Sequence, residues 1–206
     1  YGQPIIINYE NYPMQFPTDV NTYNTTGGDY ITVVGKNLGF LGWKVETVSY
    51  GMLSDDEFQL DTSLCTIETP HEKLVCPMAP GAGMQMTWRL VVDGQSSVYP
   101  TSAYGRPVVS GFSIDSTSIL QSSINGLNSH GGQKIIINGQ NFGPRDDFIT
   151  KVTYGPFGTN YVAKNCTIKV ASFQIVCLTA PGVGQNHKWI VSIRGQTNEL
   201  KVEEPT

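Results

Sequence analysis

Apolar residues in this chain form short alternating runs rather than the wider spacing of an amphipathic helix. Ile31 and Val33 alternate with less apolar neighbours, and Ile135 and Ile137 do the same. Runs rich in Ile, Val, Thr and Tyr are interrupted by Gly, Pro, Asn or Asp, roughly every eight to twelve residues. Alternation is expected of strands that place one face on a core, and this spacing is typical of a β-sandwich.

The same pattern occurs twice along the chain. Residues 27–39 are matched 104 positions later by residues 131–143, with the glycines, one Ile and one Asn in place. Residues 65–95 are matched by residues 166–196 at an offset of 101. This second match includes two cysteines, the segment Ala-Pro-Gly-x-Gly, a Trp and a closing Gly-Gln. A repeat of this length indicates two copies of one structural unit.

The repeat also predicts the domain boundary. The change of offset from 104 to 101 means that the first copy has three more residues between Tyr50 and Cys65, in a segment that includes an acidic loop. The natural junction is Tyr104-Gly105-Arg106-Pro107. We therefore expect two domains of ordinary size, residues 1–104 and 105–206.

Four cysteines form two equally spaced pairs, Cys65 with Cys76 and Cys166 with Cys177. In an antiparallel hairpin joined by the first pair, Ile67 lies opposite Leu74. The second pair places Ile168 opposite Ile175 in the same way. Because both opposed positions are apolar, we predict one local disulfide in each domain. Zinc coordination is the alternative role of these thiols, but their spacing lacks the close cysteine pair of a zinc knuckle.

Two Asn-x-Thr sequons are candidate glycosylation sites, at Asn24 and Asn165. Together with the paired cysteines they favour an oxidising compartment. We therefore expect an extracellular location. The first residue is Tyr1 and no basic and apolar signal segment follows it, so targeting signals are expected elsewhere in the parent protein.

These motifs, in this order, resemble the IPT/TIG family of immunoglobulin-like domains. The resemblance covers nearly the whole chain, twice, and implies an all-β fold of two tandem immunoglobulin-like (IPT/TIG, E-set) β-sandwiches. The family includes ectodomains of plexins and scatter-factor receptors, social-amoeba tiger-type receptors, parts of carbohydrate-active enzymes and intracellular transcription factors. The cysteine pairs favour the cell-surface branches, and the Asn- and Thr-rich loops favour the amoeba-type adhesion and allorecognition receptors. The matched positions are framework positions, so no ligand residue follows from the resemblance.

Candidate catalytic and metal-binding groups are scattered along the sequence. His71, His130 and His187 lie in different regions and outside any His-Glu-x-x-His motif. The acidic clusters at residues 55–57 and 146–147 lack the ordered ligand spacing of a calcium loop, so we interpret them as solvated loop acids. We expect no enzymatic activity, no cofactor and no metal.

Charge is divided unequally between the two copies. Residues 1–104 contain 4 Lys+Arg and 11 Asp+Glu, a net charge of −7, whereas residues 105–206 contain 9 and 6, a net charge of +3. Such a division can steer a partner of opposite polarity or pair a second copy head to tail, although surface charge can also drift between paralogous repeats. The sequence pI of about 5.3 argues against nucleic acid as a partner.

Two segments of the first domain are candidate partner contacts, namely Asp55, Asp56, Glu57 and Phe58 in the acidic loop, and Met84 and Met86. Loops at the end of a sandwich commonly carry binding, and flexible Met side chains suit protein recognition. Met84 and Met86 share strand parity with Trp88, which we expect in the core. The alternative for the two methionines is therefore an extension of that core.

The predicted function is non-catalytic protein recognition by a cell-surface adhesion or allorecognition receptor. The expected partner is another cell-surface protein, in heterophilic or homophilic contact. No apolar run approaches the roughly 20 residues of a membrane helix, so this segment is not expected to insert in a membrane, although the parent protein is expected to be anchored. The alternative is an accessory carbohydrate-binding domain pair of a secreted protein or enzyme.

Overall fold

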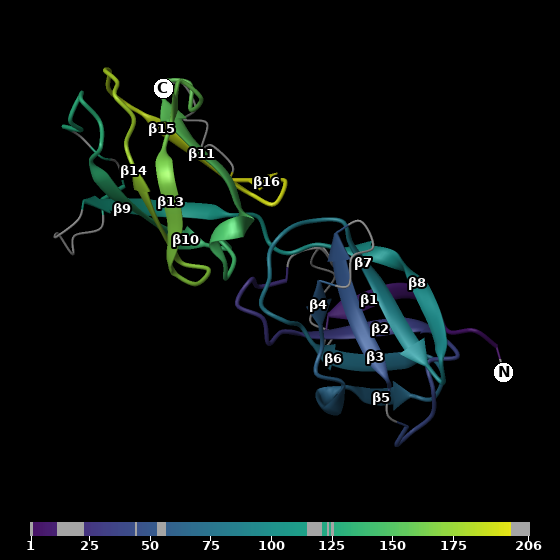
Figure 1. The fold of residues 1–206 in the computed structure, drawn as a ribbon. Helices are drawn as coiled ribbons and strands as arrows, with labels where there is room; N and C mark the ends of the chain where they lie inside the picture. The colour runs from purple at the N-terminus through teal and green to yellow at the C-terminus, as the bar shows by residue number, and fades with distance from the viewer. Residues whose placement is uncertain are drawn as a thin grey trace, which may run out of the picture. The chain divides into compact units, whose positions relative to one another are not determined.

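The computed structural model describes residues 2–11, 23–43, 45–52, 57–114, 121–122, 124 and 126–198. The chain divides into two compact units, Tyr1–Gly105 and Arg106–Thr206. Figure 1 shows the first unit in purple to teal and the second in teal and green to yellow. The division falls one residue after the boundary expected from the repeat. Within the described part of the chain, no helix combines the length and hydrophobicity that crossing a membrane requires.

Unit 1 consists of two four-stranded antiparallel sheets (Figure 1). The first sheet has the order β1 (Ile5–Asn11), β2 (Tyr30–Lys36), β6 (Lys73–Pro77), β5 (Thr66–Thr69). The second has the order β4 (Phe58–Gln59), β3 (Thr47–Met52), β7 (Met86–Val92), β8 (Gln95–Ser102). A short 3₁₀ helix, η1 (Thr62–Leu64), precedes β5.

Unit 2 repeats this arrangement strand for strand. Its first sheet has the order β9 (Val108–Ile114), β10 (Lys134–Gln140), β14 (Gln174–Leu178), β13 (Lys164–Val170). Its second sheet has the order β12 (Tyr161–Val162), β11 (Ile149–Gly155), β15 (Lys188–Ile193), β16 (Gln196–Thr197). The 3₁₀ helix η2 (Asp146–Phe148) precedes β11. The prediction of two tandem immunoglobulin-like β-sandwiches is confirmed.

A stacked Tyr and Trp pair lies in the core of each unit. Tyr50 stacks on Trp88 with ring centroids 4.4 Å apart and planes 20° apart. Tyr154 stacks on Trp189 at 4.3 Å and 13°. Trp88 is fully buried, as its parity with Leu90 predicts, because alternate residues of β7 face the interior of the sandwich.

The stacked tyrosines also hold the repeated Ala-Pro-Gly segment. The Tyr154 hydroxyl donates a hydrogen bond to the Ala180 carbonyl oxygen at 2.9 Å and accepts one from the Ala180 amide at 2.9 Å. The Tyr50 hydroxyl makes the same two bonds with Ala79, at 3.4 and 3.2 Å. Burial raises the pKa of the Tyr50 hydroxyl well above its ordinary value, so it remains a neutral hydrogen-bonding group.

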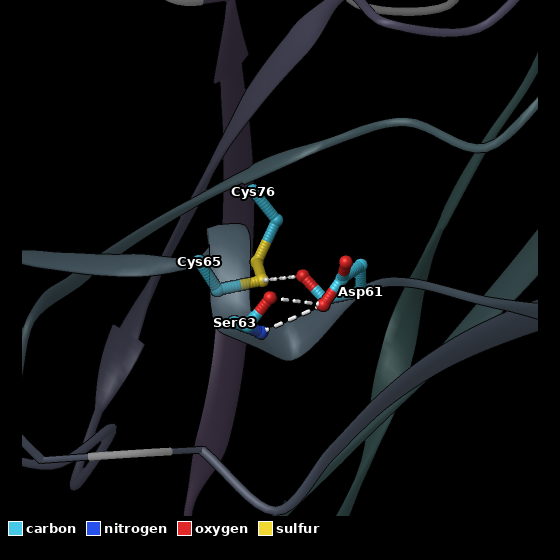
Figure 2. The surroundings of a disulfide bond; sticks show 4 residues. All are labelled: Asp61, Ser63, Cys65 and Cys76. Atoms are coloured by element: carbon cyan, nitrogen blue, oxygen red, sulfur yellow. Dashed lines mark hydrogen bonds between the residues drawn. A yellow bond between two sulfur atoms is a disulfide. The ribbon is translucent and has the colours of Figure 1, made fainter.

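Both predicted disulfides are present, Cys65–Cys76 and Cys166–Cys177. Figure 2 shows the first beside Asp61, whose carboxylate accepts hydrogen bonds from the Ser63 amide at 3.0 Å and the Ser63 hydroxyl at 2.5 Å. The predicted strand register is confirmed as well, with Ile67 opposite Leu74. Ile168 likewise lies opposite Ile175. The zinc alternative is wrong, because all four sulfur atoms are in disulfide bonds.

Candidate functional site

The predicted contact residues of unit 1 separate into buried and exposed groups. Phe58 is 7% exposed and stacks on Tyr50 at 5.1 Å, and Met86 is fully buried. The prediction of partner contact is therefore wrong for these two side chains, because β4 and β7 turn them into the core, and the alternative of a core extension is confirmed for Met86. Glu57 is half-buried and Met84 is exposed. Asp55 and Asp56 lie outside the described residues.

A groove lies at the end of unit 1 where β2 ends and β8 begins. It encloses about 220 Å³ and is lined by Gly2, Pro4, Asn37, Gly39, Phe40, Trp43, His71, Val92, Asp93 and Gln95. These residues come from the start of the chain, the loop after β2, the β5–β6 turn and the β7–β8 turn. Concave sites lined by apolar and aromatic groups with a few polar groups are the usual places for small-ligand binding.

Two aromatic rings at the groove are open to solvent. Phe40 is 49% exposed and Trp43 is 38% exposed. Their ring centroids are 4.7 Å apart and their planes meet at 62°. The Trp43 amide donates a hydrogen bond to the Phe40 carbonyl oxygen at 2.9 Å, which closes a turn and keeps the two rings together. Leu41, between them, is also exposed. This is a concentration of apolar surface that the core does not use.

The loop that carries these rings is fixed by its neighbours. Leu38 is fully buried, and its amide donates a hydrogen bond to the His71 carbonyl oxygen at 3.2 Å. The His71 amide in turn donates to the Gly39 carbonyl oxygen at 2.5 Å. Gly39 has φ +105°, and a Cβ there would lie 3.5 Å from Trp43 Cδ1, so Trp43 packs directly over the Gly39 backbone. The loop is thereby tied to the β5–β6 turn that Cys65–Cys76 braces.

Polar residues line the groove together with the two rings. The Asn37 side-chain amide donates to the Gln3 carbonyl oxygen at 2.9 Å and holds the start of the chain against the groove. Asp93 and Gly94 have φ of 49° and 70°, the two left-handed residues of a tight hairpin turn between β7 and β8. The Gly94 amide donates to a Glu46 carboxylate oxygen at 3.3 Å. Amide, imidazole and carboxylate groups therefore line an otherwise apolar groove.

The corresponding end of unit 2 keeps the backbone connections of this site. The Asn141 side chain donates to the Arg106 carbonyl oxygen at 2.9 Å, as Asn37 does to Gln3. The Phe142 amide donates to the Ser172 carbonyl oxygen at 3.2 Å, and the Ser172 amide donates to the Gly143 carbonyl oxygen at 2.8 Å. The loop frame is therefore common to both units.

The side chains on that frame differ in unit 2. At the offset of 104, Pro144 and Asp147 stand where unit 1 has Phe40 and Trp43. Phe148 is buried, and the guanidinium carbons of Arg145 and Arg194 lie 4.5 and 4.7 Å from its ring centroid. Arg145 also pairs with Asp147 at 3.3 Å. The Phe148 ring at this end of unit 2 is thus covered by arginine, whereas Phe173, on the β13–β14 turn, is 43% exposed.

No local pattern in the sequence predicts the groove. The signal lies in the comparison of the two copies, in which Phe40 and Trp43 stand in place of Pro144 and Asp147 just after the repeated Gly-x-Asn-x-Gly motif. Within the described residues, no group of three or more His, Cys, Asp or Glu side chains is placed to hold a metal ion. Both sequon residues, Asn24 and Asn165, are exposed.

Comparison with known proteins concerns the fold. Residues 114–202 match the model of the IPT/TIG domain. Comparison with curated proteins gives no significant match. A surface glycan-binding protein from Prevotella bryantii, PbSGBP-B, is similar in structure, with a TM-score of 0.52, 15% sequence identity, and coverage of 96% of this chain and 41% of that protein. SGBP-B from a complex xyloglucan utilization locus in Bacteroides uniformis matches with a TM-score of 0.36, 16% identity, and coverage of 96% and 48%.

The chain spans less than half the length of each of these two solved structures. At 15% identity, the likeness to the Prevotella protein concerns the fold alone. It extends over nearly all of this chain and agrees with the two antiparallel sandwiches described above. The residues that match the family model lie in the second of the two tandem immunoglobulin-like β-sandwiches.

Proposed function

We propose that this chain is a non-catalytic carbohydrate-binding domain pair of an extracellular protein, and that the unit 1 groove holds the sugar. The observation that carries the proposal is the exposed pair Phe40 and Trp43 at the edge of a groove lined by polar side chains. The main prediction from the sequence was protein recognition, and the groove favours the alternative stated beside it.

The chemistry of the groove suits a sugar ring. A pyranose has a face of C–H groups and a rim of hydroxyl groups. An aromatic side chain can cover the C–H face and remove its apolar surface from water. Asn37, Asp93 and Gln95 offer amide and carboxylate groups that can donate to or accept from hydroxyls. The site therefore combines the two kinds of contact that a neutral carbohydrate requires.

Two further observations support an extracellular glycan-binding role. Disulfides such as Cys65–Cys76 and Cys166–Cys177 persist in oxidising compartments. The Prevotella protein that shares the fold is named a surface glycan-binding protein. Attachment of the parent protein to a cell surface and N-glycosylation of Asn24 and Asn165 belong to the same proposal.

Protein recognition by an adhesion or allorecognition receptor is the second candidate. It is favoured by exposed apolar side chains in unit 2, away from the groove, where Phe157 is 78% exposed and Val183 is 74% exposed. The unequal charge of the two copies, −7 and +3, adds a means of orienting a protein partner. Here the partner is a second cell-surface protein, in heterophilic or homophilic contact.

A glycan array probed with the complete chain tests the first candidate. The wild type is compared with the variant Phe40→Ala/Trp43→Ala, and Phe157→Ala is the matched control because Phe157 is an exposed aromatic residue in the other unit. We expect the wild type and the control to bind the same glycans, and the double variant to lose at least tenfold in affinity. Capture of a cell-surface ectodomain with no glycan bound would favour the second candidate instead.

A further inference from the structure

We propose that the groove accepts a single neutral pyranose unit, at a chain end or a side branch, and not a flat run of polysaccharide. This inference rests on the proposed function and defines the class of sugar that the site takes. It follows from the angle between Phe40 and Trp43, the size of the groove and the charge of its lining.

The two rings form a corner rather than a platform. A flat polysaccharide chain lies across aromatic rings that share a plane. The planes of Phe40 and Trp43 meet at 62°, with ring centroids only 4.7 Å apart. One ring can therefore lie under the C–H face of a sugar while the other meets the edge of the same sugar. Two consecutive sugars of an extended chain cannot both stack on this pair.

Packing assigns different roles to the two rings. Trp43 packs over the Gly39 backbone, so its position is fixed by the loop. Phe40 is the more exposed of the two, at 49% against 38%. We therefore assign Phe40 as the ring that stacks on the sugar and Trp43 as the wall beside it.

The size of the groove agrees with one sugar. Its volume of about 220 Å³ is smaller than the roughly 300–1,000 Å³ of pockets that hold drug-sized ligands. The β5–β6 turn with His71 and the β7–β8 turn with Asp93 both contribute to its lining. An oligosaccharide would place its remaining sugars outside the groove, where they add little to binding.

Charge selects against acidic sugars. Asp93 lines the groove, and the Glu46 carboxylate lies next to it, bonded to the Gly94 amide. A uronate carboxylate or a sulfate group in the groove would face Asp93 at short range. Like charges about 4 Å apart in water weaken binding roughly fivefold. The local lining and the net charge of −7 for residues 1–104 therefore both favour a neutral ligand.

Titrations of the complete chain, followed by ¹H–¹⁵N NMR at the Trp43 indole, test this proposal. The probes are methyl β-glucopyranoside, methyl β-galactopyranoside, methyl α-mannopyranoside, methyl β-glucuronide and cellohexaose. We expect at least one neutral glycoside to bind saturably and cellohexaose to bind no more tightly than that glycoside. Phe40→Ala should abolish the response, and Phe40→Tyr should retain it. Methyl β-glucuronide should bind at least fivefold more weakly than the neutral glycosides, and Asp93→Asn should reduce that difference.

Failure of the inference and failure of the proposed function give different results. Cellohexaose binding ten times more tightly than any glycoside, or glucuronide binding as tightly as the neutral sugars, would overturn the single-unit proposal and leave glycan binding intact. If no probe and no glycan of the array perturbs the Trp43 indole, the proposed function itself is contradicted.

Discussion

The corresponding ends of the two units share a backbone and differ in what they present to solvent. In both, an Asn side chain and the turn between two strands of the first sheet hold the same loop, through Asn37 and His71 in one unit and Asn141 and Ser172 in the other. Unit 1 places open aromatic rings on this frame. In unit 2, arginines cover Phe148 next to this loop, and the exposed ring, Phe173, lies on the β13–β14 turn instead.

The difference shows how one sandwich frame can serve either binding or stability. An exposed Phe or Trp leaves apolar area in contact with water, which costs free energy until a ligand covers it. Arginines above Phe148 remove that exposed area within the unit itself. The frame shared by the two units therefore belongs to the fold, whereas the proposed function rests on the side chains at positions 40, 43 and 93.

The largest expected effect tests whether each unit has its own, independent core. Trp88→Ala removes the ring that stacks on Tyr50 and that donates a hydrogen bond to the Ser102 hydroxyl at 2.7 Å. Loss of so large a buried ring should lower the free energy of unfolding of unit 1 by about 3–5 kcal/mol. Trp189→Ala should do the same to unit 2.

Hydrogen exchange in urea, read peptide by peptide, measures the two units separately in the complete chain. Trp88→Ala should weaken protection in residues 1–105, and Trp189→Ala should weaken it in residues 106–198. A loss of protection spread equally over both units by either variant would contradict independent cores.

A smaller effect tests the shared glycine motif. Gly27 has φ +73°, and a Cβ there would lie 2.5 Å from the Pro80 nitrogen. Gly28 has φ +87° with open space around it. Gly27→Ala should therefore destabilise unit 1 by about 2 kcal/mol, through a backbone shift as well as an unfavourable φ. Gly28→Ala should cost only about 1 kcal/mol.

Urea denaturation of the two variants gives the comparison directly. Gly131→Ala is the matched variant in unit 2, because a Cβ there would lie 2.5 Å from the Ala180 carbonyl carbon. Equal destabilisation by Gly27→Ala and Gly28→Ala would show that the close approach to Pro80 has no energetic weight.

A third comparison concerns alkaline pH and separates the units. Burial raises the pKa of Tyr50 and Tyr104 far above the ordinary tyrosine value. The unfolded chain ionises near pH 10, whereas these buried hydroxyls keep their protons. Their contribution to stability is therefore complete below about pH 10 and decreases above it, by about 1.4 kcal/mol per tyrosine per pH unit.

Unit 1 should lose this stability faster than unit 2. Tyr9 and Tyr23 in unit 1 have pKa values raised in the same direction by burial. In unit 2 the described residue with a raised tyrosine pKa is Tyr154. Hydrogen exchange between pH 9 and 11, corrected for the intrinsic rate, should show protection falling first in residues 1–105. Equal loss in both units would contradict this assignment.

Local patterns were sufficient to predict much of the fold. The pairing of Ile67 with Leu74 followed from the cysteine spacing, since a hairpin with a short turn fixes its own register. Burial of Phe58 could not be predicted in the same way. Its two-residue strand is too short to show alternation, and its face is determined by pairing with Tyr50 in another strand.

The groove depends on contacts between residues that are distant in the sequence. Phe40 and Trp43 line the same groove as His71 because β2 pairs with β6. Asp93 lines it as well because the β7–β8 turn lies at the same end of the sandwich. No local sequence pattern predicts that these residues line one groove. The exposure of the two rings is likewise a property of the folded loop, since either ring could have packed into the core.

A crystal structure of the chain with the best-binding glycan of the array would show whether the unit 1 groove holds a sugar. We expect one sugar ring in the groove, stacked on Phe40 with Trp43 beside it and Asp93 near its hydroxyls. A sugar bound instead at the Arg145 and Phe148 end of unit 2, or one that leaves the groove empty, would contradict it.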